Sequence, residues 1–250
     1  MSLKEWIKES DNIVFFGGAG VSTESNIPDF RSDNGLYKKQ YPYPAEVMLS
    51  HSFYESNPKE FFEFYFNQMI YKDAKPNKAH LALAQLEKQG KLKAVITQNI
   101  DGLHQAAGSK TVYELHGSVL RNTCTGCHEK YTLDQMLEFR DESGIPRCPK
   151  CNHIIKPNVV LYEEGLDERT MMNAIQAIAQ ADLLIVGGTS LVVYPAAGLI
   201  RYFQGKHLVL INKDKTSMDD IADLVIHDSI GKVLSESVEL YDYRIKEDAF

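Results

Sequence analysis

The sequence predicts an α/β protein built on a mostly parallel, doubly wound sheet. Two observations predict this class: short apolar strands recur along the chain, and helical patterns lie between several of them. The expected strands cover residues 13–16, 94–97, 112–115, 159–161, 183–187, 208–211 and 224–226. The expected helices include 79–86 and 168–181. Strands rich in β-branched residues that alternate with helices are typical of parallel sheets covered on both faces.

Two insertions interrupt this alternation. Segment 34–75 is rich in aromatic residues, above all from Phe61 to Phe66, and segment 121–156 holds all the cysteines. An aromatic stripe at helical spacing is more typical of a core face than of a ligand site. We expect the insertions to form a smaller domain beside the sheet, with a cleft between them. The larger domain then comprises residues 1–33, 76–120 and 157–250, and the smaller one comprises 34–75 and 121–156.

Composition and charge set the class of protein. The chain has 250 residues, of which 44% are hydrophobic and 24% charged, as in ordinary globular proteins. No apolar run approaches the length of a membrane span, and the N-terminal segment is polar, so we expect a cytoplasmic protein. The net charge of −7 argues against general nucleic-acid binding and suits a cationic peptide substrate.

The cysteines form two pairs, Cys124-x-x-Cys127 and Cys148-x-x-Cys151. Each pair can place two thiolates on one side of a turn, and two such turns complete a tetrahedral zinc site. The alternatives are two disulfides, which a reducing compartment disfavours, or four unrelated thiols. Four thiolates leave no position open for water, so we expect a structural metal. His128 and His153 lie beside the pairs, and we interpret both as surface residues.

The first expected strand runs into a glycine-rich turn, Gly17-Gly18-Ala19-Gly20. Glycines let backbone N–H groups approach a pyrophosphate, and a following helix N-terminus favours negative charge. Thr23 stands where the dinucleotide fingerprint has its third glycine, and ordinary strand–turn–helix connections also need glycine. The segment 27–31 (IPDFR) then supplies a rigid turn, an acid, an aromatic ring and a guanidinium that could cover a bound nucleotide.

Polar motifs follow the later strands. Residues 97–104 (TQNIDGLH) bring two amides and a carboxylate to a strand end, where they suit a ribose or a carboxamide, or simply a turn that Asp101 caps. His116 follows the next strand and is either a structural histidine or a general base. Segments 187–196 and 211–214 repeat the pattern at two further strand ends. All these ends should face one crevice.

In combination, these motifs resemble the sirtuins, the Sir2 family of NAD-dependent protein lysine deacylases, in their bacterial form. The resemblance rests on GAGVST with IPDFR, TQNIDGLH, the His116–Gly117 pair, both cysteine pairs, GTSLVVYPA and INKD, and it covers nearly the whole chain. It implies a Rossmann-like larger domain, a smaller domain of zinc module and helical insertion, and a cleft that NAD and acyl-lysine enter from opposite sides. The expected partner is an acetylated protein or peptide, and the expected state is a monomer.

The resemblance also implies roles for individual residues. Catalysis would fall to His116 as the general base, with Asn99. The expected NAD contacts are Ala19, Gly20, Thr23, Phe30, Arg31, Gln98, Ile100, Asp101, Gly188, Thr189, Ser190, Asn212 and Ile230. The substrate peptide would lie along Val159, Val160, Tyr162 and Val193 as an added strand. The zinc ligands would be Cys124, Cys127, Cys148 and Cys151.

The reaction that the resemblance implies consumes NAD. Nicotinamide leaves the ribose, the acyl group moves from lysine to the ribose, and His116 takes a proton from the ribose hydroxyls. The products are free lysine, nicotinamide and O-acetyl-ADP-ribose. A protein mono-ADP-ribosyltransferase, which shares the NAD cleavage, is the alternative, and a silent NAD-binding scaffold is a second one.

Three departures from the family pattern bear on these expectations. Asn26 stands in place of a glycine, at small cost because asparagine tolerates left-handed backbone. Tyr162-Glu163-Glu164 replaces Phe-Gly-Glu on the peptide side. Gln68 stands where the desuccinylating branch of the family carries the arginine of a Tyr-x-x-Arg motif that begins here at Tyr65. Without that cation we expect neutral acyl groups, acetyl foremost, to be preferred.

Overall fold

A parallel sheet forms the larger part of the molecule. The computed structural model describes residues 2–32, 35–38 and 40–240, so the C-terminal segment 241–250, to which the sequence assigns no role, lies outside the described residues. The sheet has the strand order β3-β2-β1-β7-β8-β9, and every neighbouring pair is parallel. The strands are β1 (Ile13–Gly17), β2 (Leu92–Thr97), β3 (Val112–Glu114), β7 (Leu183–Gly187), β8 (His207–Ile211) and β9 (Leu224–Ile226). This is the Rossmann order, with the two halves diverging from β1, as predicted.

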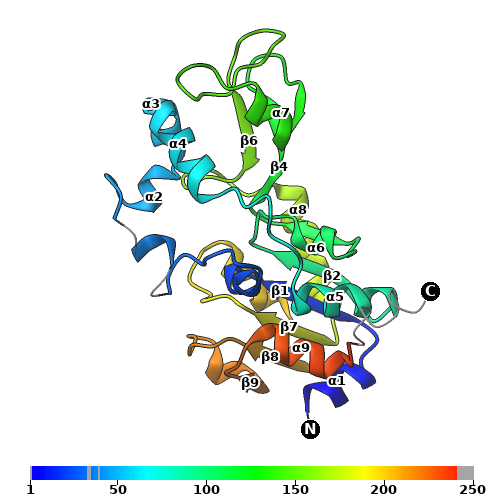
Figure 1. Ribbon diagram of the computed structural model, residues 1–250. Coiled ribbons are helices and arrows are strands. Elements are labelled where there is room, and N and C mark those ends of the chain that lie inside the picture. The colour runs from blue at the N-terminus through cyan, green and yellow to red at the C-terminus, as the bar shows by residue number, and fades with distance from the viewer. Residues whose placement is uncertain (1, 33–34, 39, 241–250) are drawn as a thin grey trace, which may run out of the picture.

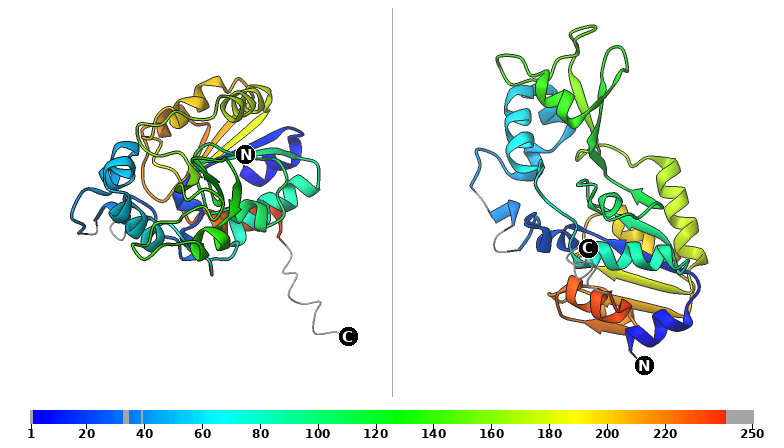
Figure 2. Two further views of the ribbon diagram at one scale, coloured as in Figure 1. Left: turned by 90° about the horizontal axis from the view of Figure 1, so that it is seen from above. Right: turned by 45° about the vertical axis from the view of Figure 1, so that its right-hand side comes forward.

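Helices cover both faces of this sheet, as Figures 1 and 2 show. One face carries α1 (Leu3–Glu9), α5 (Lys78–Lys88) and α9 (Ile230–Val238), and the other carries α8 (Glu168–Gln180) and the 3-10 segment η4 (Ala196–Tyr202). The central strand β1 divides its side chains between them: Ile13 and Phe15 belong to the first core, and Val14 and Phe16 to the second. All four are completely buried, which explains the continuous apolar run.

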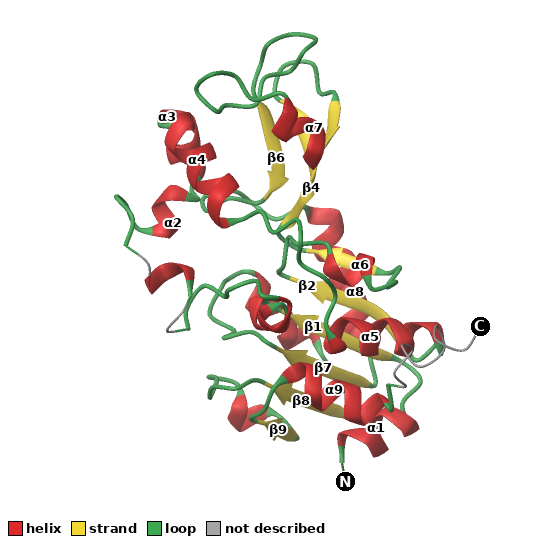
Figure 3. Cartoon of the chain, viewed as in Figure 1, coloured by secondary structure: helices red, strands yellow, loops and turns green. Residues whose placement is uncertain are grey.

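The second part of the molecule is a module with its own core. It contains a three-stranded antiparallel sheet in the order β5-β4-β6, whose strands are β5 (Lys130–Thr132), β4 (Gly117–Cys124) and β6 (Ile155–Val159). Its helices are α2 (Ala45–Met48), α3 (His51–Ser56), α4 (Pro58–Gln68) and α7 (Leu133–Glu138). Figure 3 shows this small module above the parallel sheet, on the side of β2. We propose the domain boundaries predicted above for the two parts.

The aromatic stripe belongs to the core of the small module, as predicted. Phe61 and Phe62 are completely buried on α4 and pack edge to face, with ring centroids 5.2 Å apart. Tyr65 stacks on Phe61 one turn later. Aromatic side chains bury a large apolar area each, so this one helix provides much of the module's cohesion.

Two local predictions are wrong. The expected strand 159–161 is displaced: β6 ends at Val159 and pairs with β4 in the small module, so it is not a strand of the parallel sheet. The glycine turn after β1 leads into two 3-10 segments, η1 (Ala19–Val21) and η2 (Thr23–Ser25), and not into an α-helix. Asn26, with a left-handed φ of 62°, ends the second segment, and Pro28 follows. The turn therefore has no long helix dipole behind it.

The remaining elements are short. They are α6 (Leu103–Ala106), η3 (Leu36–Lys38) and η5 (Asp219–Ile221). Within the described part of the chain, no helix is both long and apolar enough to cross a membrane.

Candidate active site

A cleft of about 590 Å³ opens at the carboxyl ends of the parallel strands, beneath the small module. Segments that follow five different strands line it: Gly18 after β1, Gln98 after β2, His116 after β3, Gly188 after β7 and Asn212 after β8. Open α/β sheets bind ligands at this edge, and the volume suits a ligand of nucleotide size. The strand ends therefore meet in one crevice, as the sequence indicates.

Two glycine turns form the floor of the cleft by packing against each other. The Gly20 N–H donates to the Gly188 carbonyl over 2.8 Å. A Cβ on Gly20 would lie 2.8 Å from the Gly188 Cα, and one on Gly188, whose φ is 59°, would lie 2.4 Å from the Val21 nitrogen. Both positions thus need glycine for close packing, and the packed turns expose the backbone around Ala19 to the cleft.

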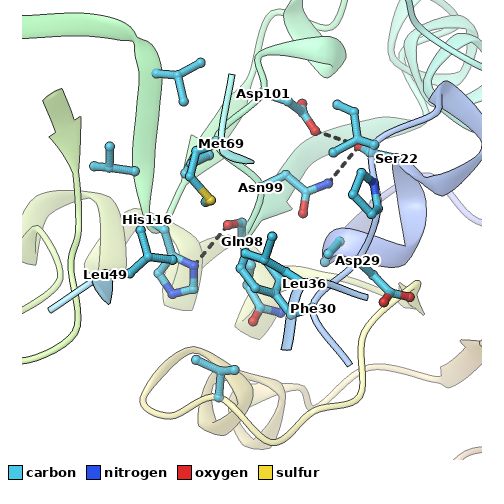
Figure 4. A pocket seen from close by; sticks show the side chains of 18 of the residues that line it. Ser22, Asp29, Phe30, Leu36, Leu49, Met69, Gln98, Asn99, Asp101 and His116 are labelled. Carbon is cyan, nitrogen blue, oxygen red and sulfur yellow. Dashed lines mark hydrogen bonds between the residues drawn. The ribbon is translucent and has the colours of Figure 1, made fainter. Parts of the chain in front are cut away.

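Ser22 connects the polar groups at the centre of the cleft (Figure 4). Its Oγ accepts a hydrogen bond from Asn99 Nδ2 over 3.0 Å and donates one to Asp101 Oδ2 over 2.6 Å. The other carboxylate oxygen of Asp101 accepts from the Leu103 N–H at 2.9 Å. Asp101 therefore forms a turn just before α6 and lines the cleft, but the N-cap of α6 is Gly102, so the prediction of Asp101 as the helix cap is wrong. Ser22 is not among the predicted site residues, because its partners Asn99 and Asp101 lie 77 and 79 positions further along the chain.

His116 lies between β3 and β4 at the same crevice. The Nδ1–H group of its ring donates a hydrogen bond to the Gln98 carbonyl oxygen over 3.0 Å. Burial lowers the pKa of His116 below its usual value, and the bond to Gln98 only partly opposes this. At neutral pH the ring is therefore uncharged, with the proton on Nδ1 and a basic lone pair on Nε2.

Further contacts hold the part of the cleft that follows β7 and β8. Gln98 Nε2 donates to Thr189 Oγ1 over 3.1 Å and so joins the ends of β2 and β7. Ser190 is exposed, and Asn212 donates from Nδ2 to the Asp214 carbonyl at 2.8 Å. The structure brings most of the predicted residues together in the cleft lining, including Ile100, Thr189, Ser190 and Asn212.

Two predicted NAD contacts lie just behind this lining. Thr23 donates from Oγ1 to the Gly20 carbonyl over 3.0 Å, and its side chain supports the glycine turn. Ile230 is buried at the start of α9, where its Cδ1 would lie 2.3 Å from a Cβ on Gly187. In the described structure both residues shape the turn that lines the cleft.

A loop over residues 27–38, with residues 33–34 outside the description, covers the cleft. Asp29 accepts from the backbone N–H of Ser32 at 2.9 Å, which forms a tight turn. The Leu36 N–H donates to the Asp29 carbonyl and the Tyr37 N–H to the Phe30 carbonyl, both at 2.8 Å. These bonds place Phe30 over the cleft beside Gln98 (Figure 4). We call this loop the cover loop.

The opposite wall is formed by residues that follow β6. Val160 donates its N–H to the His116 carbonyl at 2.9 Å, and Tyr162 donates its N–H to the Leu49 carbonyl at 3.0 Å. Glu163 adopts a left-handed φ of 75°, and its carboxylate accepts from Ser52 N at 2.9 Å. That bond satisfies a donor in the first turn of α3 and offsets the backbone strain of a non-glycine residue.

The four cysteines form a cluster away from the cleft. Their sulfur atoms all lie within 4.8 Å of one another, with Cys124 and Cys151 at 3.3 Å and Cys127 and Cys148 at 3.6 Å, and none forms a disulfide. A tetrahedron of Zn–S bonds of about 2.3 Å has edges of about 3.8 Å. The cluster therefore fits zinc as the sequence predicts. His128 and His153 are exposed and outside the cluster, also as predicted.

These features define a Rossmann-like α/β protein with a nucleotide-sized cleft and a structural four-cysteine metal module. The comparisons then identify the family. The model described as the Sir2 family matches residues 18–195. An NAD-dependent protein deacetylase of Clostridium acetobutylicum is 64% identical over 234 residues, which cover 93% of this chain and 95% of the relative.

Solved Sir2 structures share the fold. A Sir2 complex with a deacetylated p53 peptide and 3′-O-acetyl ADP ribose has a TM-score of 0.86 and 42% identity, covering 94% of this chain and 98% of the other. A Sir2–p53 peptide–NAD+ complex has a TM-score of 0.83 and 41% identity, covering 96% and 98%. The chain belongs to the Sir2 family.

Proposed function

We propose that His116 is the general base of this cleft and that the surrounding residues hold NAD and the acetyl-lysine. The chain is an NAD-dependent protein deacetylase: it removes acetyl groups from lysine side chains and transfers them to ADP-ribose, and is therefore a transferase. NAD supplies the ribose that accepts the acetyl group and releases nicotinamide, and one water molecule completes the balance between free lysine and O-acetyl-ADP-ribose. The observation that carries the role of His116 is its half-buried position in the cleft, where its Nδ1 lies 3.0 Å from the Gln98 carbonyl oxygen and leaves Nε2 as the basic nitrogen.

The proposed NAD site occupies the sheet side of the cleft. Backbone groups around Ala19 and Gly20 suit the pyrophosphate, with Arg31 as its cation, and Gly188, Thr189, Ser190 and Asn212 suit the adenosine half. Asn99, Ile100 and Asp101 would hold the nicotinamide end, where the Ser22 bonds keep the amide and the carboxylate in fixed orientation. Phe30 would exclude water from the activated ribose, which water would otherwise hydrolyse. Thr23 and Ile230 would support the site from behind.

The proposed peptide site lies along Val159, Val160, Tyr162 and Val193, which all line the cleft. An extended peptide added here would gain main-chain hydrogen bonds with modest sequence selectivity. Zinc, held by the four cysteines, would stabilise the module that carries this wall and would take no part in the reaction.

The acyl pocket supports a preference for neutral groups. Gln68 lines the cleft and accepts a hydrogen bond from the Tyr41 hydroxyl at 2.9 Å, so its amide is already oriented. Lys72, a cation of the lining, forms an ion pair with Asp134 of the small module. Among the described lining residues, a succinyl carboxylate would therefore meet no lysine without an ion-pair partner, whereas an acetyl group needs none.

We further propose that the enzyme acts as a cytoplasmic monomer on acetylated proteins and not on nucleic acids. Thiolate ligands need a reducing compartment, and the net charge of −7 opposes binding to phosphate backbones. Sedimentation at several concentrations tests the monomer.

The deciding experiment follows an acetyl-lysine peptide with NAD and measures deacetylated peptide, nicotinamide and O-acetyl-ADP-ribose together. The wild type should form all three in equal amounts, and His116→Ala should lose deacetylation. His207→Gln is the matched control, because His207 stacks on Trp6 at the opposite end of β8 and should keep full activity. Nicotinamide release without deacetylation would instead indicate ADP-ribosyl transfer.

A further inference from the structure

A pair of tyrosine hydroxyls joins the two walls of the cleft. Tyr37 belongs to the cover loop and Tyr162 to the wall that follows β6, and their hydroxyl groups hydrogen-bond to each other although the residues are 125 positions apart. The sequence assigns Tyr162 to the peptide and assigns Tyr37 no role.

Tyr37 is fixed to the two residues that would cover NAD. Its backbone N–H donates to the Phe30 carbonyl at 2.8 Å, and the two rings lie 5.5 Å apart. The Arg31 guanidinium carbon is 5.3 Å from the centre of the Tyr37 ring, within range of a cation–π contact. The position of the Tyr37 ring therefore sets the positions of Phe30 and Arg31.

Tyr162 is fixed to the small module. Its N–H donates to the Leu49 carbonyl and its carbonyl accepts from the His51 N–H, both at 3.0 Å. Two residues further on, the Glu164 carboxylate lies 2.8 Å from His51 Nδ1, in a hydrogen bond, and 3.0 Å from Lys156 Nζ, in an ion pair. The backbone at Tyr162 is thus held on both sides, while 38% of the residue remains exposed at the peptide wall.

The bond should persist over the pH range in which the enzyme works. Burial, and then the bond to Tyr162 itself, raise the pKa of Tyr37 far above its ordinary value. The Tyr37 hydroxyl therefore stays protonated, and it can donate to the Tyr162 oxygen or accept from the Tyr162 hydroxyl.

We propose that the Tyr37–Tyr162 hydroxyl pair couples the binding of the acetylated peptide to the binding of NAD. The proposal rests on the proposed function, because it takes Phe30 and Arg31 as NAD residues and residues 159–162 as the peptide wall. A peptide that holds the Tyr162 side chain in place also holds Tyr37 through the hydroxyl pair. Phe30 and Arg31, which contact Tyr37, are then kept over the NAD site. By linkage, NAD strengthens peptide binding by the same factor. Tyr37 and Tyr162 are positioning residues.

The test measures the dissociation constant of an NAD analogue whose nicotinamide–ribose bond does not break, with and without a saturating acetyl-lysine peptide. The ratio of the two constants reports the coupling. One neutral hydrogen bond contributes about fivefold, so Tyr37→Phe and Tyr162→Phe should each lower the ratio about fivefold. The double variant should fall no further, because both changes remove the same bond.

Tyr202→Phe provides the matched control, since Tyr202 is an exposed tyrosine of η4 outside the cleft lining. Phenylalanine keeps each ring, and unfolding midpoints within about 2 °C of the wild type would show intact folding. A ratio unchanged in either single variant, or effects that multiply in the double variant, would overturn the coupling. A wild type that deacetylates the peptide but shows no coupling would overturn it too. Failure of the proposed function differs: the wild type would then consume no NAD.

Discussion

The two parts of this molecule achieve stability by different means. In the parallel sheet, strands such as β1 are buried on both faces, and helices on each side complete two apolar cores. The small module has one core, one aromatic helix and a three-stranded sheet, and its cysteine turns lie partly exposed. Small units bury a smaller fraction of their surface on folding and are correspondingly marginal in stability. The small module should therefore depend on zinc and the sheet should not.

Removing zinc should give the largest effect. Structural zinc contributes more free energy than any single side chain, so chelation or Cys148→Ser should unfold the small module and abolish deacetylation. The parallel sheet should keep its helical circular dichroism and its cooperative thermal transition. Metal analysis should find one zinc per chain before chelation. An enzyme that stays active without zinc would contradict the inference that the small module depends on the metal.

Truncating the aromatic core should come next. Phe62 is completely buried on α4, so Phe62→Ala should lower the free energy of unfolding of the small module by about 3–5 kcal/mol. Met172→Ala serves as control, because Met172 is 60% exposed on α8 and should change stability little. Denaturant titration with a probe in each part separates the two transitions. Equal losses for both variants would refute the packing argument.

Removing the Ser22 hydroxyl should affect the site more than the fold. Ser22→Ala leaves the buried Asn99 amide and the Asp101 carboxylate without a shared partner, which should cost about 1–3 kcal/mol, or roughly 5- to 150-fold in kcat/KM. Ser22→Thr retains a hydroxyl and should recover part of the loss. Steady-state kinetics at saturating peptide measure both. Full activity in the alanine variant would show that the two groups are oriented by other contacts.

The same contrast explains what the sequence could predict. The parallel strands were found because two-sided burial demands unbroken apolar runs such as 183–187, and the cysteine site was found because its ligands come as local pairs. Strand β6 was misplaced because its partner β4 is selected by tertiary pairing, and Pro157 weakens its local signal. Ser22 and Tyr37 were missed because each acts on a residue 79 or 125 positions away. Such roles arise only when the chain has folded.

Acid should lower the free energy of unfolding of the parallel-sheet part of the molecule through two buried histidines. His80 on α5 and His104 on α6 pack with ring centroids 4.7 Å apart, and neither ring nitrogen of His104 has a hydrogen-bond partner among the described residues. Burial lowers the pKa of His80 to about 4, although the charges of Asp101 and Glu24 oppose the shift. Burial, and then His80, lower the pKa of His104 to about 3.

These lowered pKa values give the pH dependence a definite sign. Below about pH 6.5, these histidines bind protons in the unfolded chain but stay unprotonated in the folded protein. The free energy of unfolding therefore falls as the pH falls towards about 4. Each histidine should contribute about 1.4 kcal/mol per pH unit in this window. His104→Leu removes one titrating group from an apolar site, so its stability should decline less steeply than that of the wild type. Urea titrations of both proteins between pH 7 and pH 5 measure the two slopes. Parallel slopes would mean that His104 takes up its proton as readily in the folded state as in the unfolded chain.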